Sequence, residues 1–304
     1  MLQKIKDWMM PLAMLTGGIF YNFFGNLSWV TPYLIFFMLL FTFSKLSPKG
    51  IRFSKLHIVL LTIQLVTGGI AYYALRSYDP VLAQGAMICF MAPTATSAAV
   101  ITGMLNGNIA FLTSFTLLSN LGVALMAPAM FPLVGNDPDL TFWDAFFRIF
   151  IKVFPLLIMP LLTAWGIRFL MPRLQKQMLN YPKVPFYLWV FALMVVTGRT
   201  VSSLMNAERH DFRTEFLLAL IAFLICCAQF ALGKWIGSRY DNRIACGQSL
   251  GQKNTILAIW MTQAFLNPVA SLAPATYVLW QNIINSYQLW KTHQQKRIAE
   301  KVKP

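Results

Sequence analysis

Two short polar stretches interrupt long apolar sequence, and they hold the residues best suited to chemistry. One is 92–99 (APTATSAA) and the other is 247–255 (GQSLGQKNT). The residues that we select from them as candidates are Pro93, Thr94, Thr96, Ser97, Ser249, Gly251, Gln252, Lys253 and Asn254. A proline inside a helix removes a hydrogen-bond donor, and neighbouring hydroxyls can satisfy the backbone groups that it frees. The stretch at 247–255 is too polar to face lipid, so we expect it to face a cavity or another broken segment. For 92–99 alone, a kinked packing helix remains the alternative.

Lys253 is the most informative single residue, because a charged side chain in the middle of an apolar segment is costly and usually functional. Three interpretations are open. Its ammonium could act as a fixed cation that ties two broken helices together through carbonyls and helix C-termini. It could carry a proton, or it could be a structural lysine that reaches a water-filled vestibule.

Three other basic residues lie within apolar spans, and each could face either a ligand or the membrane surface. Arg199, in span 185–206, either meets an anionic ligand or, as we favour, reaches the outer headgroups. Arg148 and Lys152 lie one helical turn apart near the start of span 143–170. We favour the outer interface for this pair, with a substrate-access vestibule as the alternative.

The composition requires lipid as the surrounding solvent. Of the 304 residues 57% are apolar and only 12% are charged, whereas about 25% of a soluble domain is charged. The three histidines (His57, His210, His293) form no cluster. The four cysteines (Cys89, Cys226, Cys227, Cys246) lie in or beside apolar runs and indicate packing, not disulfides. We therefore expect no metal site and no cofactor.

Ten apolar runs are long enough to cross a bilayer, which takes roughly 20 residues per helix. They are 8–25, 29–46, 55–76, 80–104, 108–131, 143–170, 185–206, 213–237, 242–265 and 269–291. The fourth and ninth runs carry the two polar stretches, so we expect broken helices there.

The basic residues fix the expected orientation. With the N-terminus inside, 18 of the 25 basic residues fall on the inner side, as the positive-inside rule requires. They are Lys4, Lys6, Lys45, Lys49, Arg52, Lys55, Arg168, Arg173, Lys176, Lys183, Lys234, Arg239, Arg243, Lys291, Lys296, Arg297, Lys301 and Lys303. The outer loop at 135–144 carries Asp137, Asp139 and Asp144. The net charge of +15 therefore reflects topology and attraction to anionic lipid, and we expect no nucleic-acid partner. We expect a multi-pass protein of a cell membrane, the inner membrane of a bacterium, with both termini cytoplasmic.

Two halves of five spans each would run in opposite directions. Short matches support a repeat: Met10-Pro11-Leu12 with Phe154-Pro155-Leu156, and Tyr78-Asp79 with Tyr240-Asp241. Inverted repeats with one broken helix in each half are how many secondary carriers build a site at the membrane midplane.

The chain resembles the bile acid:sodium symporter family over essentially its whole length. The residues that carry this resemblance are Pro93, Thr96, Val100 and Gly107, then Gly251 and Asn254, then Phe265, Asn267 and Pro268, and finally Trp280-Gln281-Asn282 with Ser286. The resemblance implies an all-α membrane protein of ten transmembrane helices in two inverted five-helix repeats, whose broken fourth and ninth helices cross. It implies a panel domain at 1–50 and 143–206 (spans 1, 2, 6 and 7). A core domain would cover 51–142 and 207–291 (spans 3–5 and 8–10), with 292–304 as a cytoplasmic tail. Asn282 joins the candidate site on this resemblance.

The chain departs from that family where the family binds sodium. The family's ligand positions correspond here to Ala98, Ala99, Leu112, Ser249 and Lys253, while a threonine is retained as Thr116. No carboxylate of the chain lies deep in a span. Methyl groups and an ammonium do not bind Na⁺, so we expect transport that does not depend on sodium.

The resulting prediction is a secondary carrier for a small organic anion, bile-acid-like or bearing a carboxylate or sulfonate, and not an enzyme. Lys253 would replace the sodium ion. The alternatives are a transport-inactive membrane sensor or ligand-binding protein, and a sodium- or proton-coupled symporter of the same fold. An oligomeric partner is left open.

Overall fold

The structure, a computed structural model, describes residues 2–46, 50–135, 141–181, 183–206 and 211–302. Within these ranges the chain is helical and contains no β-strand. The fold class expected from the sequence, an all-α protein, is confirmed at this level.

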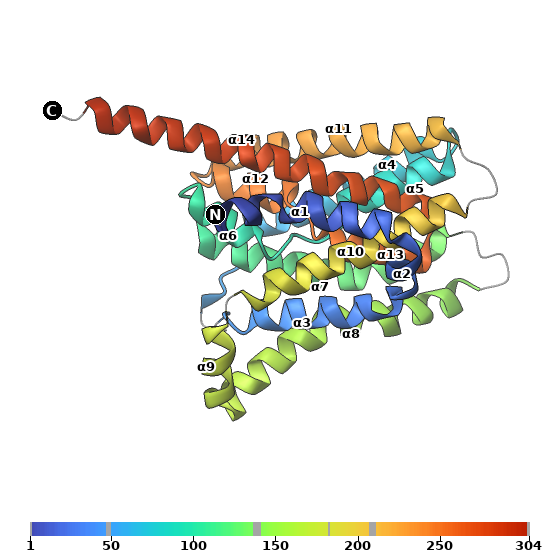
Figure 1. Cartoon of the computed structure of the whole chain (residues 1–304), viewed down its shortest axis with the longest axis horizontal. Coiled ribbons are helices and arrows are strands. Elements are labelled where there is room, and N and C mark those ends of the chain that lie inside the picture. The colour runs from blue at the N-terminus through green and yellow to red at the C-terminus, as the bar shows by residue number, and fades with distance from the viewer. Residues whose placement is uncertain (1, 47–49, 136–140, 182, 207–210, 303–304) are drawn as a thin grey trace.

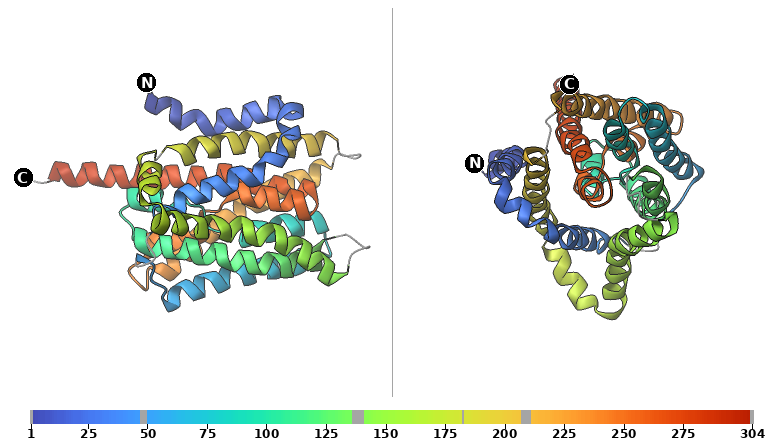
Figure 2. Two further views of the ribbon diagram at one scale, coloured as in Figure 1. Left: turned by 90° about the horizontal axis from the view of Figure 1, so that it is seen from below. Right: turned by 90° about the vertical axis from the view of Figure 1, so that its right-hand side faces the viewer.

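The helices are α1 (Leu2–Ile19), α2 (Tyr21–Asn26), η1 (Ser28–Val30), α3 (Thr31–Phe43), α4 (Lys55–Leu75), α5 (Pro80–Met91), α6 (Ala98–Met104), α7 (Ile109–Val134), α8 (Phe142–Leu170), α9 (Pro172–Asn180), α10 (Val184–Met205), α11 (Phe212–Gly237), α12 (Arg243–Gly251), α13 (Thr255–Phe265), η3 (Pro268–Ser271) and α14 (Leu272–Val302). Most of them run along one common direction, and both described ends of the chain lie at the same end of the bundle (Figure 1, Figure 2).

Five of these helices are long and apolar enough to cross a membrane, namely α4, α7, α8, α10 and α11. Three shorter apolar helical segments accompany them, at Ser28–Phe43, Pro80–Met91 and Thr255–Phe265. Large apolar side chains such as Ile19, Phe169 and Phe216 are exposed on the outside of the bundle. An α-helical protein with this surface suits a membrane and not water.

The runs expected to break are both broken. The run at 80–104 is divided into α5 and α6, and the run at 242–265 into α12 and α13. The sequence reading missed α9, a nine-residue helix that crosses the common direction at the end of the bundle where the chain begins and ends (Figure 1). The loop expected outside the membrane, around Asn136–Asp139, lies outside the described residues.

Close helix packing positions the two broken segments. Helix α11 packs against α5, α12 and α14, while α10 packs against α1, α2 and α3. A Cβ atom at Gly233 of α11 would collide with the carbonyl oxygen of Cys246 in α12, so only glycine allows this approach. Helices α7 and α8 also pack together.

Two carboxylates hold the ends of α5 and α11 together. Asp79 accepts hydrogen bonds from the backbone N–H groups of Val81 (2.7 Å) and Leu82 (3.1 Å), and so caps α5. The Thr214 hydroxyl of α11 lies 2.7 Å from a carboxylate oxygen of Asp79 and 2.7 Å from one of Asp211. Hydrogen bonding to Thr214 lowers the pKa of the Asp211 carboxyl. The similar Asp241 is not such a cap: its φ is 51°, and Asn242 precedes α12 without a side-chain cap. The resemblance between Tyr78-Asp79 and Tyr240-Asp241 is therefore not matched in local structure.

Candidate functional site

The two broken segments cross and bind each other through their backbones. The Ala95 N–H donates to the Gln252 carbonyl (2.9 Å), and the Asn254 N–H donates to the Pro93 carbonyl (2.7 Å). These bonds form an isolated antiparallel bridge between Thr94 and Lys253. The break in each helix exposes backbone groups, and the other break satisfies them, which is why two interruptions occur together.

Side chains complete the crossing. The Thr94 hydroxyl, fully buried, donates to the Ser249 carbonyl (2.7 Å), and the Thr94 N–H donates to the Ser119 hydroxyl (3.1 Å). Gln281 of α14 accepts from the Lys253 N–H (2.9 Å), and the Tyr277 hydroxyl donates to the Gly251 carbonyl (3.0 Å). The crossing is therefore anchored to α7 and α14 as well as to itself.

The C-terminal end of α5 is capped by three side chains from elsewhere in the chain. A helix end leaves its last four carbonyl groups without partners. Gln229 of α11 donates to the Cys89 carbonyl (3.1 Å). Gln64 of α4 donates to those of Met91 (3.0 Å) and Ala92 (2.9 Å). The remaining carbonyl, that of Phe90, accepts from the Lys253 ammonium at 2.8 Å.

Lys253 thus places a positive charge at the negative end of a broken helix, where it is favourable. Its side chain is 1% exposed. In the described part of the chain it has no ion-pair partner and no aspartate or glutamate beside it. Carbonyl oxygens and the helix dipole are what stabilise this cation, as they would stabilise a bound metal ion in the same place.

Pro93, Ser249, Gly251 and Gln252 are buried, and the other candidates are less enclosed. Thr96 and Asn254 are half-buried at the crossing, and Ser97 is exposed, with its hydroxyl 3.4 Å from the Gln252 amide nitrogen. Asn254 also caps α13 by accepting from the Leu257 N–H (3.3 Å). Arg199 is exposed on α10, and both interpretations of it stay predictions.

Asn282 donates to the Val278 carbonyl of its own helix (2.6 Å), and no hydrogen bond joins it to the crossing in the described structure. Its neighbour Gln281 makes that contact instead. Sequence reasoning also missed Gln64, Gln229 and Tyr277. The available signal was the position of polar side chains in the middle of apolar runs.

The five positions that the sequence resemblance paired with sodium ligands offer too few side-chain oxygen atoms for a sodium ion. Ala98 and Leu112, both 0% exposed, pack with Ala245 in an apolar cluster. The Thr116 hydroxyl donates to the Leu112 carbonyl (3.0 Å), and Lys253 brings a cation. The Ser249 hydroxyl oxygen is buried without a hydrogen-bond partner, but it is one oxygen where several are needed. Among the described residues, no three or more histidine, cysteine, aspartate or glutamate side chains lie close enough together to hold a metal ion.

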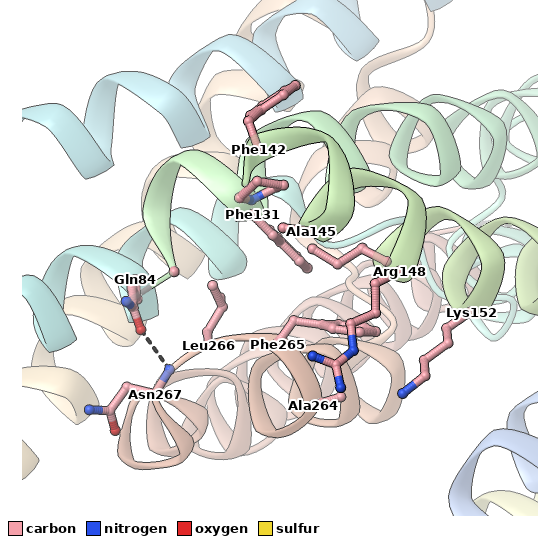
Figure 3. A pocket seen from close by; sticks show the side chains of 13 residues that line it. Gln84, Phe131, Phe142, Ala145, Arg148, Lys152, Ala264, Phe265, Leu266 and Asn267 are labelled. Carbon is pink, nitrogen blue, oxygen red and sulfur yellow. Dashed lines mark hydrogen bonds between the residues drawn. The ribbon is translucent and has the colours of Figure 1, made fainter. Parts of the chain in front are cut away.

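A pocket of about 470 Å³ opens beside α8 (Figure 3), near the start of that helix, which lies at the end of the bundle away from the chain termini (Figure 1). It lies between α8 and the ends of α5, α7 and α13. Arg148 and Lys152 of α8 line it, with Phe131 of α7 and Phe265 of α13. The Lys152 ammonium lies 6.0 Å from the centre of the Phe265 ring. Both side chains line this pocket, and the outer-interface position expected for the pair stays a prediction.

A second pocket, of about 670 Å³, lies at the opposite end and is lined by Arg52, Lys55, His57 and Asn108, among others. His57 is 2% exposed, and its ring nitrogens pair with the N–H and hydroxyl of Ser54 and with the Phe111 carbonyl. It therefore fixes the start of α4. Neither pocket includes Thr96 or Asn254, so the cavity expected around those two residues stays a prediction.

The fold and the crossing together define an all-α protein of the membrane type with a polar, lysine-containing centre. No known family matches the chain by its sequence profile, and no curated protein matches it either.

The hydrogen bond from the Thr94 hydroxyl to the Ser249 carbonyl should contribute measurably to the stability of the protein. We expect Thr94→Val to lower the free energy of unfolding by about 1–3 kcal/mol, because the buried Ser249 carbonyl loses its donor. Thr102→Val is the matched control: Thr102 is also 0% exposed, but its hydroxyl has no partner. Removing that unpaired hydroxyl should leave stability unchanged or raise it. Thermal unfolding in lipid nanodiscs measures both, and an equal loss in the two variants would contradict the assignment.

Proposed function

We infer that the protein is a secondary carrier for a small organic anion, working by alternating access without a requirement for sodium. The observation that carries this proposal is the pair of broken helices that cross at a buried ammonium. A soluble or purely structural bundle has no use for two helix breaks and an unpaired buried cation, both of which are costly. Carriers use such breaks to build a binding site at the membrane midplane.

The architecture proposed for this function is that of the bile acid:sodium symporter family, which the sequence resembles. It has ten transmembrane helices in two inverted five-helix repeats, with a panel of spans 1, 2, 6 and 7 and a core of the other six. Support comes from the order of the helices and from the paired breaks. In this arrangement the half-exposed polar groups Thr96, Ser97 and Asn254 lie where a substrate would meet the crossing.

The proposed orientation places both termini in the cytoplasm of a bacterial inner membrane. It rests on the basic residues, which include Arg173 and Lys176 on α9 at the end of the bundle that holds both termini. Thiol labelling of intact cells that carry Gln177→Cys tests it. Labelling from outside would invert the orientation.

Within this function Lys253 takes the place of a coupling cation. Its ammonium is held by the Phe90 carbonyl at the end of α5, and its backbone forms the bridge to Thr94. In this role the ammonium links the two broken helices. Two other roles remain as alternatives: a proton carried by Lys253, and coupling to sodium through backbone oxygens.

A membrane sensor that binds the anion without moving it is the second candidate function, and the absent sodium-site residues favour it. An enzyme has less support, since no catalytic pair occurs among the described residues of the crossing. Uptake of radiolabelled cholate and 2-naphthoate into proteoliposomes separates the candidates. We expect protein-dependent accumulation above that of empty liposomes. Binding of either anion without uptake would replace the carrier with the sensor.

A further inference from the structure

The pocket beside α8 gathers positive charge that nothing in the described chain neutralises. Arg148 and Lys152 line it from successive turns of α8 (Figure 3). No aspartate or glutamate is among its described lining residues, and neither cation has an ion-pair partner in the described part of the chain. The nearest acidic residue along α8 is Asp144, which does not line the pocket and accepts from the Thr141 hydroxyl (2.5 Å). The described lining of the pocket therefore carries two positive charges and no negative one.

Lys152 lies about three turns into α8. It is the eleventh residue of a helix of 29. At 1.5 Å per residue it therefore lies about 15 Å from the helix start. A lysine this far along an apolar helix is accommodated where it faces a cavity or reaches the headgroups, and here it lines the pocket. Phe146, Phe150 and Phe154 form a stacked series on another face of α8, with ring centres 5.9 and 4.7 Å apart. Charge and aromatic surface are thus separated around the helix.

Apolar side chains make up much of the rest of the lining. Phe131, Phe265 and Ile149 supply apolar walls. At the far side, Gln84 accepts from the Asn267 N–H (2.8 Å) and donates to the Val134 carbonyl (3.1 Å). Both polar ends of the Gln84 amide are therefore in use. A complementary ligand has one acidic end for the cations and an apolar body for the walls.

We propose that this pocket binds an organic anion with one carboxylate or sulfonate on a ring-bearing apolar body. The acidic group lies between Arg148 and Lys152, and the ring lies against Phe131 and Phe265. The arginine fork pairs with both oxygens of a carboxylate, whereas the lysine supplies a point charge. A volume of about 470 Å³ is within the usual range for a small-molecule site.

The pocket lies between α8 of the proposed panel and α5, α7 and α13 of the proposed core. In an alternating-access carrier, the boundary between moving parts is where substrate is admitted. This second step, that the bound anion passes on to the crossing, rests on the proposed carrier function. Binding itself does not.

The test uses 2-naphthoate as the probe and 2-naphthamide as its neutral control of the same shape. Isothermal titration calorimetry on the full chain in nanodiscs of neutral lipid measures both affinities. We expect 2-naphthoate to bind at least about tenfold more tightly than the amide, and Arg148→Gln and Lys152→Gln each to weaken 2-naphthoate by about tenfold or more. Arg76→Gln is the matched control. Arg76 is an exposed arginine at the same end of the bundle that stacks on Tyr73 and does not line the pocket, so its loss should change neither affinity.

Equal affinity for the acid and the amide, no binding of 2-naphthoate by the wild-type protein, or unchanged affinity in both glutamine variants would each overturn the pocket assignment. Thermal unfolding checks that the variants are folded, and Arg148→Lys, which keeps the charge, should retain part of the affinity. Uptake into proteoliposomes separates this inference from the proposed function. If the wild-type chain binds 2-naphthoate through Arg148 but does not accumulate it, the carrier fails and the pocket stands. If it accumulates the anion and the glutamine variants bind and accumulate it as well as the wild type, the pocket fails and the carrier stands.

Discussion

Lys253→Met should reduce anion uptake by about ten- to a hundredfold while leaving most of the protein folded. The ammonium makes a charge-assisted hydrogen bond to the Phe90 carbonyl at the end of α5. Such a bond contributes about 1.5–3 kcal/mol, and the helix dipole adds to it. Losing it lowers the equilibrium constant for assembling the crossing, relative to locally opened states, by about ten- to a hundredfold. Uptake depends on that equilibrium.

Global stability should change much less than uptake, by no more than about 2 kcal/mol. Burying an ammonium costs several kcal/mol, and an apolar side chain of similar size removes this cost. Methionine fills the space of the lysine stem and adapts to irregular surroundings. The unfolding transition in nanodiscs should therefore remain cooperative and close to that of the wild-type protein.

Gln229→Met provides a matched control for the charge of Lys253. Gln229 is also buried, and it caps the same helix end through the Cys89 carbonyl, but it is neutral. Its loss should lower stability by about 1–3 kcal/mol, with uptake reduced only a few-fold. If the two variants lose uptake equally, capping of α5 is what matters and the charge of Lys253 has no separate role.

The contrast between these two residues indicates what the sequence could and could not predict. Lys253 was found from sequence because a charge within an apolar run is conspicuous. Pro93 and the polar residues around Gly251 likewise indicated where α5 and α12 end. Gln229 was passed over, because a single amide in an apolar run is unremarkable and its partner, the Cys89 carbonyl, is fixed only by the packing of α11 on α5.

The pocket shows the same division between local and spatial information. The spacing of Arg148 and Lys152 places both side chains on one side of a helix, which sequence reveals. Helix α13 ends beside these two residues, and the Phe265 ring lies near the Lys152 ammonium. Both facts depend on the direction in which α13 runs after the second break, which sequence does not reveal. For the same reason Asn282 and Gln281 could not be told apart: adjacent residues differ by about 100° around a helix, and only the crossing decides which faces inward.

Ligand affinity and uptake should be the same, within about twofold, in sodium and in choline at equal ionic strength. Sodium requires several oxygen ligands, whereas Ala98 and Leu112 are packed with Ala245 in an apolar cluster. A sodium ion at the crossing would also lie near the Lys253 ammonium. At a separation of about 4 Å and an effective dielectric of about 20, two unit charges repel by roughly 4 kcal/mol. That repulsion would weaken sodium binding by about a thousandfold. A gain in affinity of tenfold or more in sodium would disprove this account and point to backbone carbonyls as ligands.

The double variant Ser249→Glu with Lys253→Gln should acquire a sodium response. It removes the competing ammonium and adds a carboxylate at a position where the native hydroxyl is fully buried and has no partner. The response should be small, because Ala98 and Leu112 still supply no side-chain oxygen. Ser249→Gln with Lys253→Gln is the control: it has nearly the same shape but no negative charge, so its uptake should not respond to sodium. A sodium response of equal size in both double variants would show that loss of the lysine alone is sufficient. The carboxylate would then have no part in it, and the repulsion by Lys253 would be the whole reason for sodium independence.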